Sequence, residues 1–185
     1  TSTIRFINDS TNNVVTNSTV LGSSVTTIGS GGGTILVSTA ATGVSGNDGN
    51  VISNNNIGPS GSNLPTKAIN GNGTSAAISN SGIVISGNKI FDYFGPGIQS
   101  AGVYVTSGNT DWSINNNRFY QTATRTQTAA TIHAGIQLAS SQINNCSISG
   151  NTIGFSNDSG SGTYNFVGFG PPSKFYPIFL STHGT

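Results

Sequence analysis

One six-residue pattern recurs five times along the chain, and this repetition constrains the possible folds more than any other feature. Each copy runs apolar, polar, Asn or Gly, Asn or Ser, any residue, apolar. The copies begin at Val15, Ile52, Ile85, Ile114 and Ile148, so successive starts lie 29 to 37 residues apart. A period of this length is typical of solenoids and repeat arrays.

The residue composition indicates that each repeat consists of short strands and turns. Gly, Asn, Ser and Thr are abundant, and these residues favour turns over helix interiors. Hydrophobic residues make up 34% of the chain, and the prominent ones, Ile, Val and Phe, suit strands. Neither helical spacing nor a hairpin turn repeats with the pattern. We therefore predict an all-β chain in which each repeat is one coil of short strands.

The connections between repeats are uneven in length. A second apolar strand follows each copy of the pattern, for example at residues 33–37 and 135–138, and the connection leading to it spans 8 to 25 residues. One corner of every coil is therefore predicted to carry loops of different sizes. Such loops argue against an ice-binding solenoid, which needs a regular Thr array.

The fourth position of the pattern is predicted to form a ladder of stacked side chains. Equivalent residues of stacked coils lie about 4.8 Å apart. An Asn amide can donate to one neighbour and accept from the next, and it can satisfy backbone groups of a buried turn. The residues predicted to form this ladder are Ser18, Asn55, Asn88, Asn117 and Asn151.

This arrangement resembles the right-handed parallel β-helix repeat of the pectin-lyase-like superfamily. The resemblance covers essentially the whole chain and implies a solenoid of about five coils. No amphipathic capping helix is evident at either end. We therefore expect residues 1–185 to be a single, uncapped β-helix segment of a longer chain, with flanking coils of the same polypeptide as its neighbours.

The low-charge composition is similar to that of large bacterial cell-surface or secreted proteins with β-helix stretches, including those of Bacteroidota. That similarity implies an extracellular or cell-surface location. The segment Asp9-Ser10-Thr11 also matches the pattern that such bacteria O-glycosylate, which makes Ser10 a candidate modification site.

The superfamily includes polysaccharide lyases and hydrolases. A catalytic function of this kind would require suitably placed carboxylates. Glycoside hydrolysis needs two carboxylates flanking one bond. Asn109-Thr-Asp111 resembles a polygalacturonase motif, but the other motifs of that family do not accompany it. The two histidines, His133 and His183, lack metal-ligand spacing. We assign no catalytic residue, metal or cofactor. The alternative is a polysaccharide-active lyase, hydrolase or tailspike-like protein whose catalytic residues lie largely outside this segment.

A binding function finds more support, because the longest connection is rich in aromatic residues. Exposed aromatic rings can stack on sugars or contact a partner protein. The competing interpretation is that the rings fold back onto the coil. The sequence predicts an adhesive or structural module that binds a glycan or another surface protein through Tyr164, Phe166, Phe169, Phe175 and Tyr176.

The net charge of +1 argues against nucleic acid as a partner, because binding to phosphates needs a basic stripe. No apolar run approaches the roughly 20 residues of a membrane-spanning helix. We therefore expect neither nucleic-acid binding nor membrane insertion.

Overall fold

The computed structural model describes residues 1–39, 42–171 and 173–181. Within them, strands are linked by turns and by a single 3-10 turn, η1 (Ala76–Ile78). The strands are β1 (Ile4–Phe6), β2 (Val14–Thr16), β3 (Thr19–Gly22), β4 (Ile35–Ser38), β5 (Val51–Ser53), β6 (Asn56–Pro59), β7 (Lys67–Asn72), β8 (Asn80–Ser81), β9 (Val84–Ser86), β10 (Lys89–Phe91), β11 (Ser100–Val105), β12 (Asn109–Thr110), β13 (Ser113–Asn115), β14 (Arg118–Tyr120), β15 (Arg125–Thr126), β16 (Ile132–Leu138), β17 (Ile143–Asn144), β18 (Ser147–Ser149), β19 (Thr152–Phe155), β20 (Phe166–Val167) and β21 (Lys174–Leu180).

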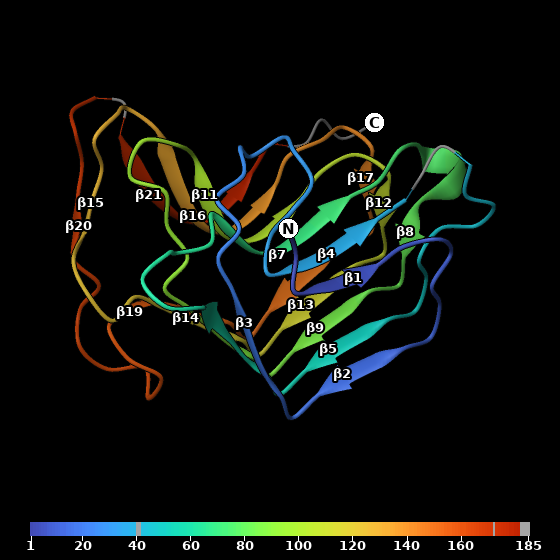
Figure 1. The fold of residues 1–185 in the computed structure, drawn as a ribbon, viewed down its shortest axis with the longest axis horizontal. Helices are drawn as coiled ribbons and strands as arrows, with labels where there is room; N and C mark the ends of the chain where they lie inside the picture. Colours follow the sequence, from blue (N-terminus) through green and yellow to red (C-terminus); the bar gives the residue numbers. More distant parts are fainter. Residues whose placement is uncertain (40–41, 172, 182–185) are drawn as a thin grey trace.

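Every pairing between these strands is parallel, so the all-β prediction is confirmed at the level of parallel sheets. The chain visits the sheets in rotation, and each full pass adds one strand to the six-stranded sheet and one to each five-stranded sheet (Figure 1). The largest is a six-stranded sheet, β1-β4-β7-β11-β16-β21. We call the two five-stranded sheets the β2–β18 sheet and the β3–β19 sheet. A three-stranded sheet (β8, β12, β17) and the pair β15–β20 complete the set.

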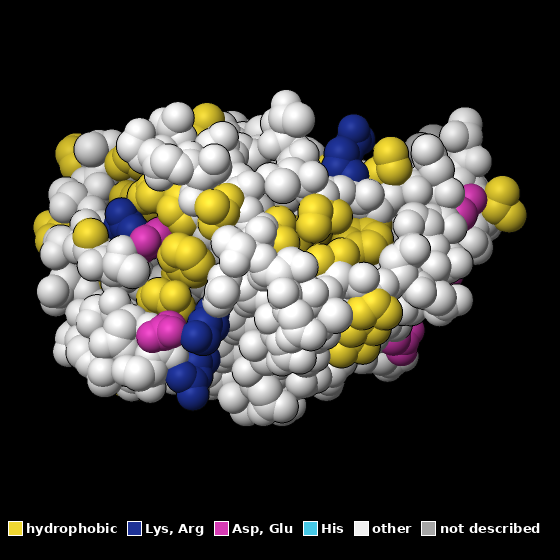
Figure 2. All heavy atoms as spheres, turned by 60° about the horizontal axis from the view of Figure 1, so that its bottom comes forward, with side chains coloured by type: hydrophobic (Ala, Val, Ile, Leu, Met, Phe, Trp, Pro, Cys, Tyr) yellow, Lys and Arg dark blue, Asp and Glu magenta, His cyan; other side chains and the backbone are white. Residues whose placement is uncertain are grey.

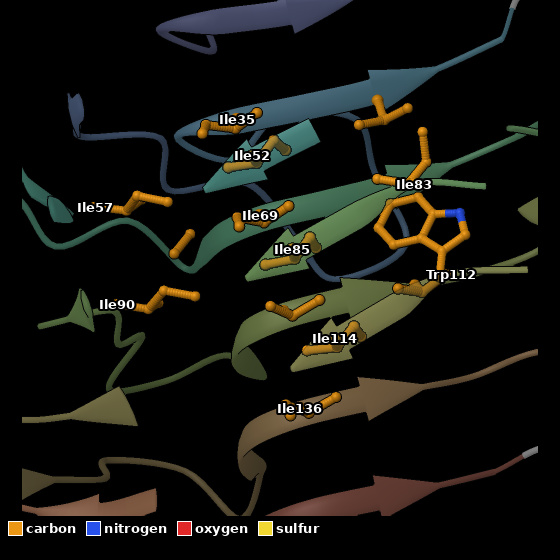
Figure 3. Packing of buried hydrophobic residues seen from close by; sticks show 14 of the residues in the cluster. Ile35, Ile52, Ile57, Ile69, Ile83, Ile85, Ile90, Trp112, Ile114 and Ile136 are labelled. Atoms are coloured by element: carbon orange, nitrogen blue, oxygen red, sulfur yellow. The ribbon is translucent and has the colours of Figure 1, made fainter. Parts of the chain in front are cut away.

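The core consists of apolar columns that run across the sheets. Ile52, Ile85 and Ile114 occupy matching positions of β5, β9 and β13, and all three are fully buried (Figure 3). Alternate strand residues point to opposite faces, so one apolar residue per strand is enough to continue each column. Trp112 lies in the same core, and its indole N–H donates to the carbonyl of Asn80 at 3.0 Å.

The predicted ladder residues lie at one corner of the molecule, between the two five-stranded sheets. The Oδ1 atom of Asn88 accepts from the backbone N and the Nδ2 of Asn55, at 2.9 and 3.1 Å. The Nδ2 of Asn88 donates to Asn117 and to the carbonyl of Ile52. Asn151 continues this pattern after Asn117, while Ser18 contributes only its backbone N–H, which donates to Asn55 at 3.0 Å.

The residue before each ladder position makes the tight bend of this corner. The φ angles lie between 52° and 65°, a region that Gly and Asn tolerate better than other residues. This explains why the third position of the sequence pattern is always Gly or Asn. The residues are Asn17, Asn54, Gly87, Asn116 and Gly150.

A second asparagine ladder, which the sequence pattern did not predict, forms a neighbouring corner. Both the backbone N and the Nδ2 of Asn47 donate to Asn80, and the Nδ2 of Asn80 donates to Asn109 at 2.9 Å. These three asparagines are fully buried. Each precedes a member of the first ladder by eight residues in the sequence.

Candidate functional site

A candidate site lies on the outer face of the six-stranded sheet. Tyr104, Gln137 and Phe179 occupy matching positions of β11, β16 and β21. Each follows a residue on the inner face of the sheet, so its side chain points to the outer face. Tyr104 and Phe179 belong to a small apolar cluster outside the main core, which also contains Ala101 and Ala134. This face is therefore partly covered by its own side chains and carries an apolar surface.

A hollow of about 310 Å³ opens on this face, and we call it the Tyr176 hollow. One lining residue, Gln99, donates from its Nε2 to the Oε1 of the buried Gln137 at 2.8 Å. Its lining combines polar and apolar side chains, as is typical of small-ligand sites. The lining residues are Gln99, Ala130, Thr131, Ile132, Lys174 and Tyr176.

Tyr176 gives the hollow an aromatic wall with a fixed orientation. Its ring stacks on the ring of Phe179 with centroids 4.8 Å apart and planes 17° apart. The Lys174 ammonium lies over the Tyr176 ring, 5.9 Å from its centroid. An aromatic wall, the Gln99 amide and one cation together offer stacking, hydrogen bonding and charge to a bound molecule.

The five aromatic residues of the predicted binding loop separate into three environments. Phe169 is 66% exposed and stands clear of the core. Tyr176 lines the hollow. Tyr164, Phe166 and Phe175 instead pack around His133, which lies on β16. The structure thus places one of the five rings at the hollow, leaves one exposed and turns three inward.

His133 lies inside a cage of aromatic rings. Burial, together with the nearby positive charge of Arg125, lowers the pKa of His133 to about 3, so the imidazole is neutral at pH 7. Its Nδ1 lies 2.8 Å from the Oγ of Ser100, and both residues are fully buried. A serine and histidine without access to solvent cannot serve as a nucleophile and base for an external substrate. The caging rings, with centroids 5.2 to 5.9 Å from that of His133, belong to Tyr93, Phe94, Tyr164, Phe166 and Phe175.

Four of the five aspartates are held by separate partners rather than gathered at one site. Asp92 forms a largely buried ion pair with Arg125. Asp9 accepts from the backbone N–H groups of residues 44–46, which lower the pKa of its carboxyl. Asp48 accepts from Ser81. The fourth, Asp158, pairs with Lys89.

The fifth aspartate, Asp111, is exposed at a bend with a φ of 58°. Among the residues that the structure describes, no group of three or more His, Cys, Asp or Glu residues could hold a metal ion. His183 lies outside the described residues.

Ser10, the candidate modification site, is half-buried next to the second ladder. Its backbone N–H donates to Asn47 at 2.9 Å, and its carbonyl accepts from Asn50 at 2.7 Å. Its Oγ accepts from the Nδ2 of Asn13 at 2.9 Å. Attachment of a sugar at Oγ would have to accommodate this contact.

Several residues in the Tyr176 hollow or packed beside it were not predicted from the sequence. Gln99, Gln137 and Phe179 lie in or next to apolar strands, where their types suggested no role. Alignment of β16 with β21 could have identified two of them as neighbours, because Gln137 and Phe179 occupy matching positions. A second hollow, of about 470 Å³, is lined mainly by apolar groups, among them Val25, Leu64 and Phe94.

Comparisons with known proteins found no matching family model, no similar curated protein and no similar solved structure. Over the residues that the structure describes, no helix has the length and apolarity to cross a membrane. The case for a function therefore depends on the geometry of this molecule.

Proposed function

We propose that this chain is a right-handed parallel β-helix module of an extracellular or cell-surface protein, and that it binds a glycan through the outer face of its six-stranded sheet. Sheets that are all parallel and are visited in rotation support the β-helix assignment. The pectin-lyase-like relationship, the bacterial origin and the flanking coils are parts of the same proposal. The low content of charged residues, 6%, and the many Asn, Ser and Thr residues support an adhesive or structural role.

The observation that carries the proposal is the wall of the Tyr176 hollow. A pyranose ring presents an apolar C–H face, which can stack on an aromatic ring, and hydroxyls that need hydrogen-bond partners. Tyr176, held against Phe179, supplies the ring. Gln99, which is hydrogen-bonded to the buried Gln137, supplies an amide at the same hollow. Substrate turnover is not part of the proposal, because the aspartates are held apart.

A glycan array tests this proposal, followed by affinity measurements with any glycan that is retained. We expect Tyr176→Ala to weaken binding by about fivefold or more, because loss of one stacking ring costs about 1–3 kcal/mol. Phe169→Ala is the matched control, since Phe169 is exposed and does not line the hollow. Equal binding by wild-type and Tyr176→Ala protein, with melting temperatures unchanged, would refute a site at the hollow. Glycan cleavage that Asp111→Asn abolishes would favour the enzyme alternative.

A further inference from the structure

The second hollow, of about 470 Å³, is lined by three loops that are equivalent in successive passes of the chain. Val25 belongs to the connection from β3 to β4. Residues 62–66 belong to the connection from β6 to β7, and residues 94–98 to the connection from β10 to β11. We call this site the Val25 hollow. It shares no lining residue with the Tyr176 hollow, so the two are separate sites.

The lining of the Val25 hollow is mainly apolar and carries no charge. Figure 2 shows charged side chains beside several hydrophobic patches on one face of the molecule. In the described part of the chain, by contrast, no Lys, Arg, Asp, Glu or His lines this hollow. A charged ligand would therefore lose water without gaining a partner of opposite charge, which is costly. The apolar side chains of the lining are Val25, Leu64, Phe94, Pro96 and Ile98.

Polar groups in the walls of the hollow are already used to hold the loops together. The backbone N–H of Phe94 donates to the carbonyl of Pro65 at 2.9 Å. The hydroxyl of Thr66 donates to the carbonyl of Thr26 at 2.6 Å. A ligand therefore meets mainly apolar contacts, and hydrogen bonds are left to the part of it that stays near solvent. The exposed polar side chains of the lining are Ser62 and Asn63.

The wall that contains Val25 is held in place by β7. This wall belongs to the loop at residues 23–33, and the buried Lys67 ammonium donates to three carbonyls of that loop, at 2.7, 3.2 and 2.7 Å. The Nδ2 of Asn70 donates to a fourth, the carbonyl of Gly32, at 2.8 Å. The wall is thus formed without a ligand, which reduces the ordering that binding would require.

The size of the Val25 hollow favours a small molecule over a protein partner. Ten residues line it, whereas each side of a specific protein interface contributes about 20–30 residues. Its volume lies within the range of roughly 300–1,000 Å³ that is typical of ligand pockets. Because an apolar cavity of about 150 Å³ holds one benzene molecule, this hollow has room for two or three rings.

From these observations we infer that the Val25 hollow binds an uncharged, largely apolar molecule of two or three rings. The rings of the ligand pack between Val25 on one loop and Leu64 and Ile98 on the other two. A hydroxyl or amine of the ligand lies near Asn63, where it remains hydrated. The inference does not rest on the function proposed for the Tyr176 hollow.

Fluorescence titration with N-phenyl-1-naphthylamine, an uncharged three-ring probe that brightens in apolar surroundings, tests the inference. The comparison probe is 8-anilinonaphthalene-1-sulfonate, which has the same rings and one added sulfonate. We expect wild-type protein to bind the uncharged probe with saturation at one molecule per chain. The sulfonated probe is expected to bind at least about fivefold more weakly, because the hollow offers its charge no partner.

Two variants of the lining and two controls locate the bound probe. Val25→Asp places a charge against the rings, so we expect at least about fivefold weaker binding. Leu64→Trp fills the hollow and is expected to abolish binding. Val14→Asp is the matched control, because Val14 and Val25 are 61% and 64% exposed and only Val25 lines the hollow. Val14→Asp and Tyr176→Ala are expected to bind like the wild type. Circular dichroism melting checks that each variant folds.

Several results would overturn the inference. One is wild-type protein that does not bind the uncharged probe, or that binds the sulfonated probe equally well. Another is an affinity that neither Val25→Asp nor Leu64→Trp changes. Binding lost in Tyr176→Ala but retained in these two variants would assign the probe to the other hollow. A dimer in sedimentation velocity that Val25→Asp dissociates would identify a second copy of the chain as the occupant.

Discussion

The side-chain amide of Asn88 donates a hydrogen bond to the Oδ1 of Asn117 at 2.9 Å, across 29 residues of sequence. The same Oδ1 also accepts from the backbone N of Asn88 at 2.9 Å. One oxygen therefore satisfies two donors of the preceding pass, in a place that is fully closed to water. Buried polar groups need such partners, because an unpaired one costs about 1–3 kcal/mol.

Substitution of Asn88 by Leu is expected to lower the free energy of unfolding by about 1–3 kcal/mol. The variant removes the acceptor of the Asn55 donors and the donor to Ile52, and all of these groups are buried. Urea unfolding measures the change. Asn56→Leu is the control, because Asn56 is exposed in the adjacent strand, and we expect it to stay within about 0.5 kcal/mol of wild type. Equal stability of the two variants would contradict a stabilising ladder.

The cage around His133 predicts a loss of stability in mild acid. The pKa of His133 is about 3 in the folded protein, whereas an unfolded histidine titrates near pH 6.5. Between these two values the unfolded chain binds a proton that the folded protein does not. The free energy of unfolding should therefore fall as the pH falls from 6.5 toward 3, by up to about 1.4 kcal/mol for each pH unit.

Unfolding experiments at pH 7 and pH 4, on wild-type and His133→Gln protein, isolate this effect. Aspartates contribute to the acid sensitivity of both proteins, so the difference between the two proteins reports on His133. We expect His133→Gln to be less stable at pH 7 but to lose less stability on acidification. The same loss in both proteins would show that His133 is not kept neutral by its surroundings.

A close approach of two backbone segments predicts a strong effect of one methyl group at Gly73. A Cβ added there would lie 2.0 Å from the carbonyl oxygen of Gly108, and backbone atoms cannot move aside cheaply. We expect Gly73→Ala to cost at least about 2 kcal/mol, as for overpacked cores. Gly31→Ala is the matched control, because nothing lies within 4 Å of its added Cβ. A melting temperature of Gly73→Ala equal to that of Gly31→Ala would contradict the close approach.

Two phenylalanines of the aromatic loop are predicted to differ in their effect on stability. The Phe175 ring lies 5.5 Å from the His133 ring and 5.0 Å from the Tyr164 ring, so Phe175→Ala should cost about 2–3 kcal/mol. Phe169→Ala should cost less than about 0.5 kcal/mol, because Phe169 is exposed. Thermal denaturation compares the two variants. A larger loss of stability in Phe169→Ala than in Phe175→Ala would contradict the position of Phe175 in the cage around His133.

Short-range patterns in the sequence indicate much of the fold but little of the candidate site. The bend residues and ladder positions follow one another within six residues, so their repetition is visible without the structure. The second ladder also has a fixed offset, but its neighbours Gly46, Ser79 and Gly108 form no common pattern with it. The parallel arrangement of the sheets was predicted from the resemblance of this repeat to that of the right-handed parallel β-helix.

The burial of the aromatic loop could not be predicted, because it depends on residues distant in the sequence. Tyr164 and Phe175 turn inward because His133 and Tyr93 belong to neighbouring passes and lie close by. The sequence of one loop does not indicate which other loops lie on the same side of the molecule. The Tyr176 hollow is likewise assembled from three segments, at Gln99, 130–132 and 174–176.

Residues of the second asparagine ladder precede those of the first by a constant eight residues. This segment therefore has a fixed length in each pass, whereas the loops elsewhere can vary. Deleting one residue between Asn80 and Asn88 would turn inward side chains outward and break both ladders. Lengthening the connection between Pro59 and Lys67 would disturb neither ladder, and the entropy cost of a longer loop rises only slowly with its length. New recognition surfaces can therefore be grafted onto this molecule one loop at a time, while the interior is left as it is.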